Sequence, residues 1–208
     1  MTRQEIESDA AVRASFSVAE ADLRSLRDRL AARADEESLL ELAYRVVEGP
    51  VGRLLLVSGE RGLVRVAFDS EGFSAVLAGV AERLSPRLMH APWKLDPVAR
   101  ELDEYFAGRR QRFDVPLDFT LSSGFRRAVQ QELPSIDYGK TSTYGRLAER
   151  LGNPRAVRAV GTACATNPLP VVVPCHRVLR SDGSLGGYLG GLQAKSTLLE
   201  LEHANSTK

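Results

Sequence analysis

The sequence of 208 residues has little cysteine, few aromatic residues and no long apolar run. Two cysteines without the apolar core of a secretory signal argue against a disulfide scaffold and favour a reducing cytoplasm. No apolar run approaches the length that a membrane-spanning helix needs, so no membrane partner is expected. The two cysteines and three histidines lack paired metal-ligand spacing, and the N-terminal half has no nucleotide-binding glycine motif. We therefore expect no metal site and no cofactor.

The two halves of the chain carry charge of opposite sign. Residues 1–121 contain 17 Lys and Arg against 21 Asp and Glu, whereas residues 122–202 contain 10 against 6. A basic region favours a polyanionic partner at that face. Such an imbalance is a solvated surface about as often as a binding face, so this signal needs support from motifs.

The order of the patterns predicts a mixed α/β (α+β) fold that begins with a helical extension. The extension covers residues 1–42, with one or two helices inside 5–42. A small α/β domain follows over residues 43–120. Its three strand patterns, separated by turn residues, predict a three-stranded antiparallel sheet with strands at 44–47, 52–58 and 62–68.

Two helical patterns and one further extended segment complete the predicted α/β domain. The helices are expected over 73–84 and 97–106. Residues 112–119 can return to the sheet, and because Pro116 interrupts this segment it is expected only as an edge strand.

Residues 121–208 are expected to form a mostly helical domain that contains a helix-turn-helix. Gly152 and Asn153 are typical of a helix end, and Pro154 suits the first turn of the next helix. Two short helices joined by a glycine-containing turn have the helix-turn-helix layout. The predicted helices of this domain cover 124–133, 143–151, 154–165 and 193–202.

The second helix of this pair presents small side chains around one long cation, Arg158. A helix that reads the major groove usually presents several polar side chains. A helix of small residues can instead approach a narrow groove closely, with an arginine reaching into the base stack, as minor-groove binders do. Taken alone, Arg158 is more typical of a surface arginine in a local ion pair.

Cys175 is the candidate nucleophile, because His176 and Arg177 follow it directly. A neighbouring cation or base lowers the pKa of a thiol, and the thiolate is the form that attacks electrophiles. Glu202 could complete a relay in which the glutamate orients the histidine and the histidine accepts the thiol proton. Adjacent strand residues point to opposite faces, so the relay requires a turn at Cys175 or a bridging water. The alternative is a buried cysteine that only fills space.

Residues 143–202 contain a series of motifs in a fixed order: Tyr144–Ala148, Gly152–Val160, Asn167-Pro168, Pro174–Val178, Gly187-Tyr188 and Lys195–Glu202. In these motifs the segment closely resembles the C-terminal domain of the O6-alkylguanine-DNA alkyltransferases, also called methylated-DNA–protein-cysteine methyltransferases. The resemblance implies DNA repair by direct reversal: after nucleotide flipping, the alkyl group of O6-alkylguanine moves irreversibly to Cys175, with O4-alkylthymine as a further candidate substrate.

The same resemblance implies a role for each candidate site residue. The catalytic set is Cys175 as alkyl acceptor, His176 as its base through a water, Glu202 as the group that orients His176, Tyr144 as phosphate contact and proton donor, and Asn167 as a brace. The guanine pocket is expected to be lined by Tyr188, Gly187, Val178, Pro170 and Ser181. The DNA contacts are expected from Tyr144, Ala156, Val157, Arg158, Ala159 and Gly161, with Arg158 filling the space of the flipped nucleotide.

The implied partner is double-stranded DNA containing O6-alkylguanine, bound from the minor groove by a cytoplasmic monomer, with clustering along DNA as a further expectation. The zinc ligands of some relatives have no counterpart here, and Cys164 is interpreted as a packing residue. The alternative is a lesion-binding or regulatory helix-turn-helix protein without transferase activity. Cys175 argues against the lesion sensor, which replaces the acceptor cysteine, and the small-residue helix argues against sequence readout.

Overall fold

The computed structural model describes residues 19–206, and its contacts divide the chain between Leu40 and Glu41 into two compact units. The first unit contains one helix, α2 (Glu20–Glu36), whose last turn is joined to Glu37 by a hydrogen-bonded ion pair of 2.8 Å from Arg33. Its leucines are largely solvent-exposed, with Leu30 58% exposed. One helix is therefore confirmed in the predicted extension, and residues 5–18 lie outside the described residues.

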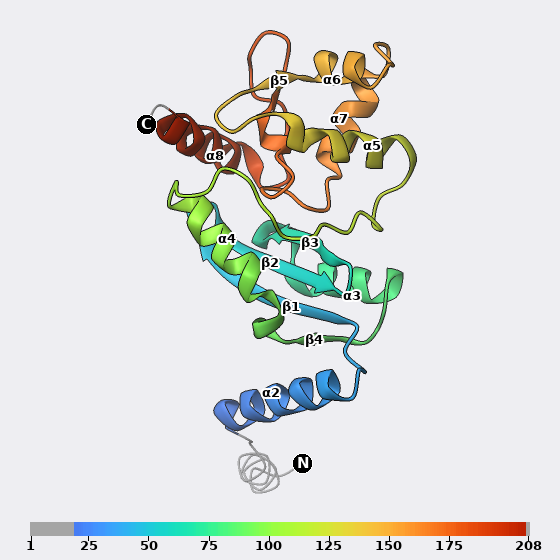
Figure 1. Ribbon diagram of the computed structural model, residues 1–208, viewed down its shortest axis with the longest axis vertical. Coiled ribbons are helices and arrows are strands. Elements are labelled where there is room, and N and C mark those ends of the chain that lie inside the picture. The colour runs from blue at the N-terminus through green and yellow to red at the C-terminus, as the bar shows by residue number, and fades with distance from the viewer. Residues whose placement is uncertain (1–18, 207–208) are drawn as a thin grey trace, which may run out of the picture. The chain divides into compact units, whose positions relative to one another are not determined.

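The second unit begins with a four-stranded mixed sheet (Figure 1). The strands β1 (Leu42–Gly49), β2 (Gly52–Gly59) and β3 (Gly62–Phe68) form the predicted antiparallel meander. The prediction of three strands is wrong, because β4 (Leu88–His90) pairs in parallel with β1 and gives the order β3-β2-β1-β4. A three-residue strand offers too little alternation to be predicted from sequence.

The core of this sheet is centred on β2. Leu55 and Val57 pack with Val80 of the helix α3 (Phe73–Arg83). Leu54 and Leu56 alternate with them along the strand, point to the opposite face and are also fully buried. The helix α4 (Asp96–Phe106) and the 3₁₀ turn before it contact β1 and β2. Both faces of β2 are therefore covered.

Residues 112–119 do not form the predicted edge strand. They meet β3 at one isolated bridge between Leu63 and Leu117, where the Leu63 N–H donates to Pro116 O (2.8 Å) and the Asp118 N–H donates to Leu63 O (2.8 Å). Pro116 has no N–H with which to extend the ladder. The close approach requires glycine at position 62, because a Cβ there would collide with the Pro116 carbonyl.

The rest of this unit is mostly helical, with α5 (Gly124–Glu132), α6 (Tyr144–Arg150), α7 (Val157–Ala165) and α8 (Gly191–Ser206). Helices α6 and α7 form the predicted helix-turn-helix. The Thr143 side chain caps α6 by accepting a hydrogen bond from the Arg146 N–H (3.2 Å). Helix α7 begins at Val157 rather than at the predicted Pro154, because the Ala156 N–H closes a turn on Asn153 O (2.9 Å).

A two-stranded parallel pairing joins the helix-turn-helix to the chain after Cys175. The strands are β5 (Ser142–Thr143) and β6 (Val178–Leu179). The pairing places Thr143, the residue before α6, beside Leu179 in the strand that directly follows the 3₁₀ turn Cys175–Arg177. Strands of two residues leave no pattern in the sequence. Among the helices of residues 19–206, none is long and apolar enough to cross a membrane.

We expect Gly62→Ala to destabilise the protein more than Gly52→Ala. Both glycines have positive φ (+121° and +90°), where an L side chain is strained, but only the Cβ at position 62 would meet backbone atoms. Gly52→Ala is expected to lower the free energy of unfolding by about 1 kcal/mol, and Gly62→Ala by at least about twice as much. Urea denaturation of the two variants measures the difference, and equal losses would contradict this account.

Candidate active site

Cys175 lies in a 3₁₀ turn, Cys175–Arg177, and is only 2% exposed. The preceding residues Val171–Val173 form a turn rather than a strand. Val171 has φ +73°, a conformation that β-branched residues rarely adopt. The 3₁₀ turn is the local geometry that a relay through adjacent residues 175 and 176 requires.

Asn167 holds the thiol of Cys175 in place from the end of α7. Its Nδ2 donates to Val173 O (2.9 Å) and to Cys175 Sγ (3.1 Å), and its Oδ1 accepts from the Leu169 N–H (3.0 Å). The residue is fully buried. Because both ends of the amide have backbone partners, a flipped amide would lose them, and the N–H donor stays directed at the sulfur.

The expected lowering of the Cys175 pKa is wrong. Burial raises the pKa of the thiol to about 11, and the hydrogen bond from Asn167 and the charge of Lys195 offset this only in part. The cation that follows in sequence, Arg177, hydrogen-bonds to Glu202 instead. At neutral pH Cys175 is therefore a thiol, and any reaction in which its sulfur acts as a nucleophile requires removal of that proton.

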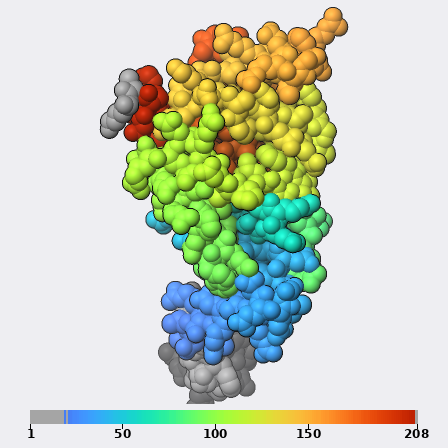
Figure 2. All heavy atoms as spheres, viewed as in Figure 1, coloured from blue at the N-terminus to red at the C-terminus, as the bar shows by residue number. Residues whose placement is uncertain are grey.

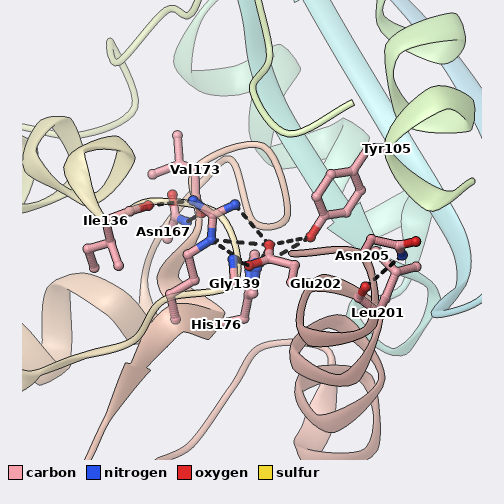
Figure 3. A network of polar contacts seen from close by, with 10 residues as sticks. Tyr105, Ile136, Gly139, Asn167, Val173, His176, Leu201, Glu202 and Asn205 are labelled. Atoms are coloured by element: carbon pink, nitrogen blue, oxygen red, sulfur yellow. Dashed lines mark hydrogen bonds and ion pairs between the residues drawn. The ribbon is translucent and has the colours of Figure 1, made fainter. Parts of the chain in front are cut away.

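The carboxylate of Glu202 is the acceptor of a buried hydrogen-bond network (Figure 3). Its Oε1 lies 2.8 Å from Nε2 of His176 and accepts from Nη2 of Arg177 (2.8 Å). Its Oε2 accepts from Nε of Arg177 (2.9 Å) and from the Gly139 N–H (3.0 Å). Burial alone would raise the pKa of Glu202, but the hydrogen bonds from His176 and Arg177 lower it to about 2.

This network determines which nitrogen of His176 can act as a base. Because Glu202 is ionised and can only accept, Nε2 of His176 carries a proton. Burial lowers the pKa of His176, although the hydrogen bond to Glu202 works in the opposite direction. The imidazole is therefore neutral at pH 7, and Nδ1, which makes no hydrogen bond to any described residue, keeps its lone pair.

Two fully buried polar residues that the sequence analysis missed complete the surroundings of the site. Tyr105 of α4 donates its hydroxyl to Oε1 of Glu202 (2.7 Å). Lys195 of α8 donates Nζ to Val178 O (2.6 Å) and reaches Gly186 O at 3.5 Å. Each lies within a helical pattern, and the sequence has no signal that distinguishes a buried polar group there from a surface one.

The predicted pocket residues lie at different depths. Pro170 and Val178 are buried, whereas Gly187 is exposed. The Tyr188 ring is in edge contact with His176 and Phe68, with ring centroids 6.3 Å and 5.6 Å apart. Ser181 is exposed in a turn, and among residues 19–206 no hydrogen bond joins it to Cys175, His176 or Glu202.

Tyr144 begins α6 and places its hydroxyl against Gly186, where any side chain would collide with it. Burial raises the pKa of Tyr144, and repulsion from the nearby Cys164 and Cys175 sulfurs, where these are ionised, raises it further. The phenol therefore stays protonated at neutral pH close to the cysteine. Cys164 itself is buried on α7, and burial raises its pKa as well, in keeping with a packing residue.

The residues predicted to contact DNA surround Arg158 on α7. Val157, Arg158 and Ala159 are exposed, and Ala156 and Gly161 are partly buried, whereas Val160 and Ala163 face the core. Within the part of the chain that the structure describes, Arg158 makes no ion pair. In the space-filling view, the atoms of the helix-turn-helix, yellow to orange, lie at an exposed end of this unit (Figure 2). Residues 19–206 contain no cluster of three or more His, Cys, Asp or Glu that could hold a metal.

Comparisons with known proteins match both parts of this unit. Residues 42–119 match the family model of the 6-O-methylguanine DNA methyltransferase ribonuclease-like domain, and residues 124–204 match that of its DNA binding domain. The methylated-DNA–protein-cysteine methyltransferase of Mycolicibacterium paratuberculosis is 39% identical, over 79% of this chain and 94% of that protein. The protein of the same name from Haemophilus influenzae is also 39% identical, over 77% and 86%.

Solved structures are similar over the same region. The crystal structure of Mycobacterium tuberculosis O6-methylguanine methyltransferase has a TM-score of 0.70 at 34% identity, and covers 79% of this chain and 94% of that one. The structure of Mycobacterium tuberculosis OGT in complex with DNA has a TM-score of 0.67 at 36% identity, with 78% and 94% covered.

We expect Glu202→Gln to destabilise the protein and to change how its stability depends on pH. The folded pKa of about 2 lies below the ordinary value of about 4.3. Ionised Glu202 therefore contributes stability that is present above the ordinary pKa and is lost as the pH falls toward 2. The substitution should lower the free energy of unfolding at pH 7 by about 3 kcal/mol.

Urea denaturation at a series of pH values measures this effect. Stability of the Glu202→Gln variant should fall less steeply between about pH 4.5 and 2 than that of the unmodified protein. Glu200→Gln, at an exposed position of the same helix, is the control. If Glu202→Gln leaves the acid dependence unchanged, the carboxylate is not stabilised as described.

Proposed function

This chain belongs to the 6-O-methylguanine DNA methyltransferase family, and we propose that it repairs DNA by transferring the alkyl group of O6-alkylguanine to Cys175. The observation that carries the proposal is the buried turn in which Cys175 precedes a neutral His176, whose Nε2 is held by Glu202 while Nδ1 stays available. A thiol and a base presented in this way beside a helix-turn-helix suit nucleophilic chemistry on a nucleotide.

Binding is to double-stranded DNA through α7, from the minor groove. The small exposed side chains around Arg158 support a close approach to a narrow groove, and the basic balance of residues 122–202 favours the phosphates. The target nucleotide must leave the stack, at a cost of a few kcal/mol that poor pairing of the lesion reduces. Arg158 fills the space that it leaves, and Tyr144 contacts the neighbouring phosphate.

The transfer is one displacement at the alkyl carbon. The thiol proton of Cys175 passes through a water to Nδ1 of His176, the sulfur bonds to the alkyl carbon, and the bond from that carbon to O6 breaks with its electrons moving to guanine. Guanine takes a proton from Tyr144, which solvent replaces. The Asn167 Nδ2–H, 3.1 Å from the sulfur, stabilises the charge that develops there.

The product limits each protein molecule to one event. A thioether on Cys175 offers no carbonyl that water could attack, so the acceptor is not regenerated. Tyr188, Gly187, Val178, Pro170 and Ser181 are proposed to line the base pocket, which could also take O4-alkylthymine. Ser181 lies in an exposed turn in this structure, so its role requires the turn to approach the bound base.

The proposal includes the organisation and setting of the protein. Residues 43–120 and 121–208 are proposed as its two domains after the 1–42 extension, which the matched ranges 42–119 and 124–204 support. We propose a cytoplasmic protein that binds DNA as a monomer and can cluster along it, and that needs no metal or cofactor for the transfer.

We expect duplex DNA containing O6-methylguanine to add one methyl group, about 14 Da, to the peptide that contains Cys175. Mass spectrometry of the digested protein measures the addition, and chromatography of the digested DNA measures the loss of the lesion. Cys175→Ser should abolish both, while the Cys164 peptide stays unmodified because that thiol is buried with a raised pKa. DNA that is bound with the lesion intact after long incubation would instead identify a lesion-binding protein.

We expect Arg158→Ala to slow transfer from duplex DNA by roughly 10- to 100-fold, because the cost of an extruded nucleotide is then uncompensated. Transfer from free O6-benzylguanine, which needs no flipping, should change less than about threefold. Arg155→Ala, which removes the same charge from the turn before α7, controls for general attraction to DNA. Equal slowing with both substrates would remove the flipping role of Arg158.

A further inference from the structure

We propose that Tyr105 is a positioning residue for alkyl transfer: its hydroxyl fixes the Glu202 carboxylate that in turn orients His176 toward Cys175. The assignment rests on the proposed function of the site. It gives a residue of the N-terminal sheet region a part in chemistry that the helical region performs. Among residues 19–206, every other hydrogen-bond donor to the Glu202 carboxylate comes from residues 139–177.

The geometry places Tyr105 where only one hydrogen-bond arrangement is available. It is fully buried at the end of α4, with its hydroxyl 2.7 Å from Oε1 of Glu202 and 3.4 Å from Nε2 of His176 (Figure 3). Burial and the nearby Glu202 charge raise the pKa of Tyr105 well above its ordinary value, so the phenol stays protonated. Since Glu202 can only accept and Nε2 of His176 already donates, the Tyr105 O–H must point at Oε1.

The ring of Tyr105 is itself held in place. It lies in contact with the rings of Phe106 (5.5 Å), Phe113 (5.2 Å) and Tyr138 (6.0 Å). The position of the Tyr105 hydroxyl is therefore fixed by packing, and its hydrogen bond holds the Glu202 carboxylate of α8 in place. A donor that is fixed by packing costs little conformational entropy when its hydrogen bond forms.

The hydroxyl also moderates the charge that His176 experiences. Oε1 of Glu202 receives the Tyr105 O–H, His176 Nε2 and Arg177 Nη2. A hydrogen bond to a carboxylate draws negative charge toward the donor and weakens the pull of that oxygen on its other partners. Without the Tyr105 hydroxyl, Oε1 would stabilise protonated His176 more strongly, and the fraction of the free base would fall at mildly acidic pH.

Other charged or titratable groups face His176, and a test must hold them constant. They are Glu202 and Lys195 from α8, Arg177 from the 3₁₀ turn, and Tyr188 from the glycine-rich segment 186–191. Substitution at position 105 leaves all of these side chains present and removes only the hydrogen bond from the Tyr105 hydroxyl to Glu202. Tyr138 offers a matched control. It is a buried tyrosine with its ring centroid 5.7 Å from Cζ of Arg177, but its hydroxyl makes no hydrogen bond to Glu202.

The experiment compares single-turnover alkylation of Cys175 by O6-benzylguanine from pH 5 to 9 in the full chain and its Tyr105→Phe and Tyr138→Phe variants. We expect the acid limb of the rate profile to move to higher pH by at least about half a unit in Tyr105→Phe. Tyr138→Phe should leave the limb in place. A role of Tyr105 in packing alone would lower the rate equally at all pH values and would not move the limb.

A second variant covers the case in which Tyr105→Phe does not fold, which thermal unfolding would reveal. Replacement of Tyr105 by 3-fluorotyrosine keeps the ring and the hydroxyl but makes the phenol a stronger donor. The acid limb should then move to lower pH, opposite to the effect of phenylalanine.

The outcomes separate this inference from the proposed function. If Cys175 of the unmodified protein is not alkylated, the proposed function itself is wrong. If the unmodified protein and Tyr138→Phe are alkylated, and folded variants at position 105 give the same acid limb as both, the role of Tyr105 is overturned while the transferase function stands.

Discussion

A single buried carboxylate, that of Glu202, organises the part of the molecule on which the chemistry depends. An ion in an apolar interior costs several kcal/mol unless donors surround it, so the folded state requires all of its partners at once. They come from α4, from the turn at Gly139 and from the cysteine turn. Through these contacts the Glu202 carboxylate of α8 joins the sheet region to the 3₁₀ turn of Cys175. The same carboxylate fixes the orientation of His176.

The same network explains why the thiol can be both protected and reactive. Burial lowers the pKa of His176, and the charge of Arg177 beside Glu202 lowers it further, so the imidazole stays neutral at pH 7. Burial keeps Cys175 protonated at neutral pH, and a thiol is a far weaker nucleophile than a thiolate. An acceptor that is used once gains from this arrangement, because stray electrophiles meet little thiolate. Proton removal then belongs to the step in which a correctly placed alkyl carbon reaches the sulfur.

Much of the fold follows from local patterns in the sequence. The meander β1–β3 and the helix-turn-helix have strong turn signals or periodic segments, and their predicted bounds are within three residues of those observed. The closing helix is predicted at the right place, but α8 begins two residues earlier and ends four residues later than predicted. The strands β4, β5 and β6 have only two or three residues each, too few to show the alternation of apolar and polar residues by which strands are predicted. Tertiary contacts decide that β4 pairs with β1 and that β5 pairs with β6. Residues 112–119 show the converse, since an extended pattern did not become a strand when Pro116 removed a donor.

In the candidate site, the residues adjacent to Cys175 in sequence are not the ones whose charge acts on its thiol in the folded protein. Arg177 adjoins Cys175 in the chain, yet the 3₁₀ turn directs its guanidinium to Glu202. The charge that does lower the thiol pKa belongs to Lys195, twenty residues further on in the chain, and it does not overcome desolvation. The prediction of Cys175 as the nucleophile therefore rested on a contact with Arg177 that the folded protein does not make. In the proposed mechanism Cys175 is activated by Asn167 and by an oriented His176, and long-range packing is what brings these groups together.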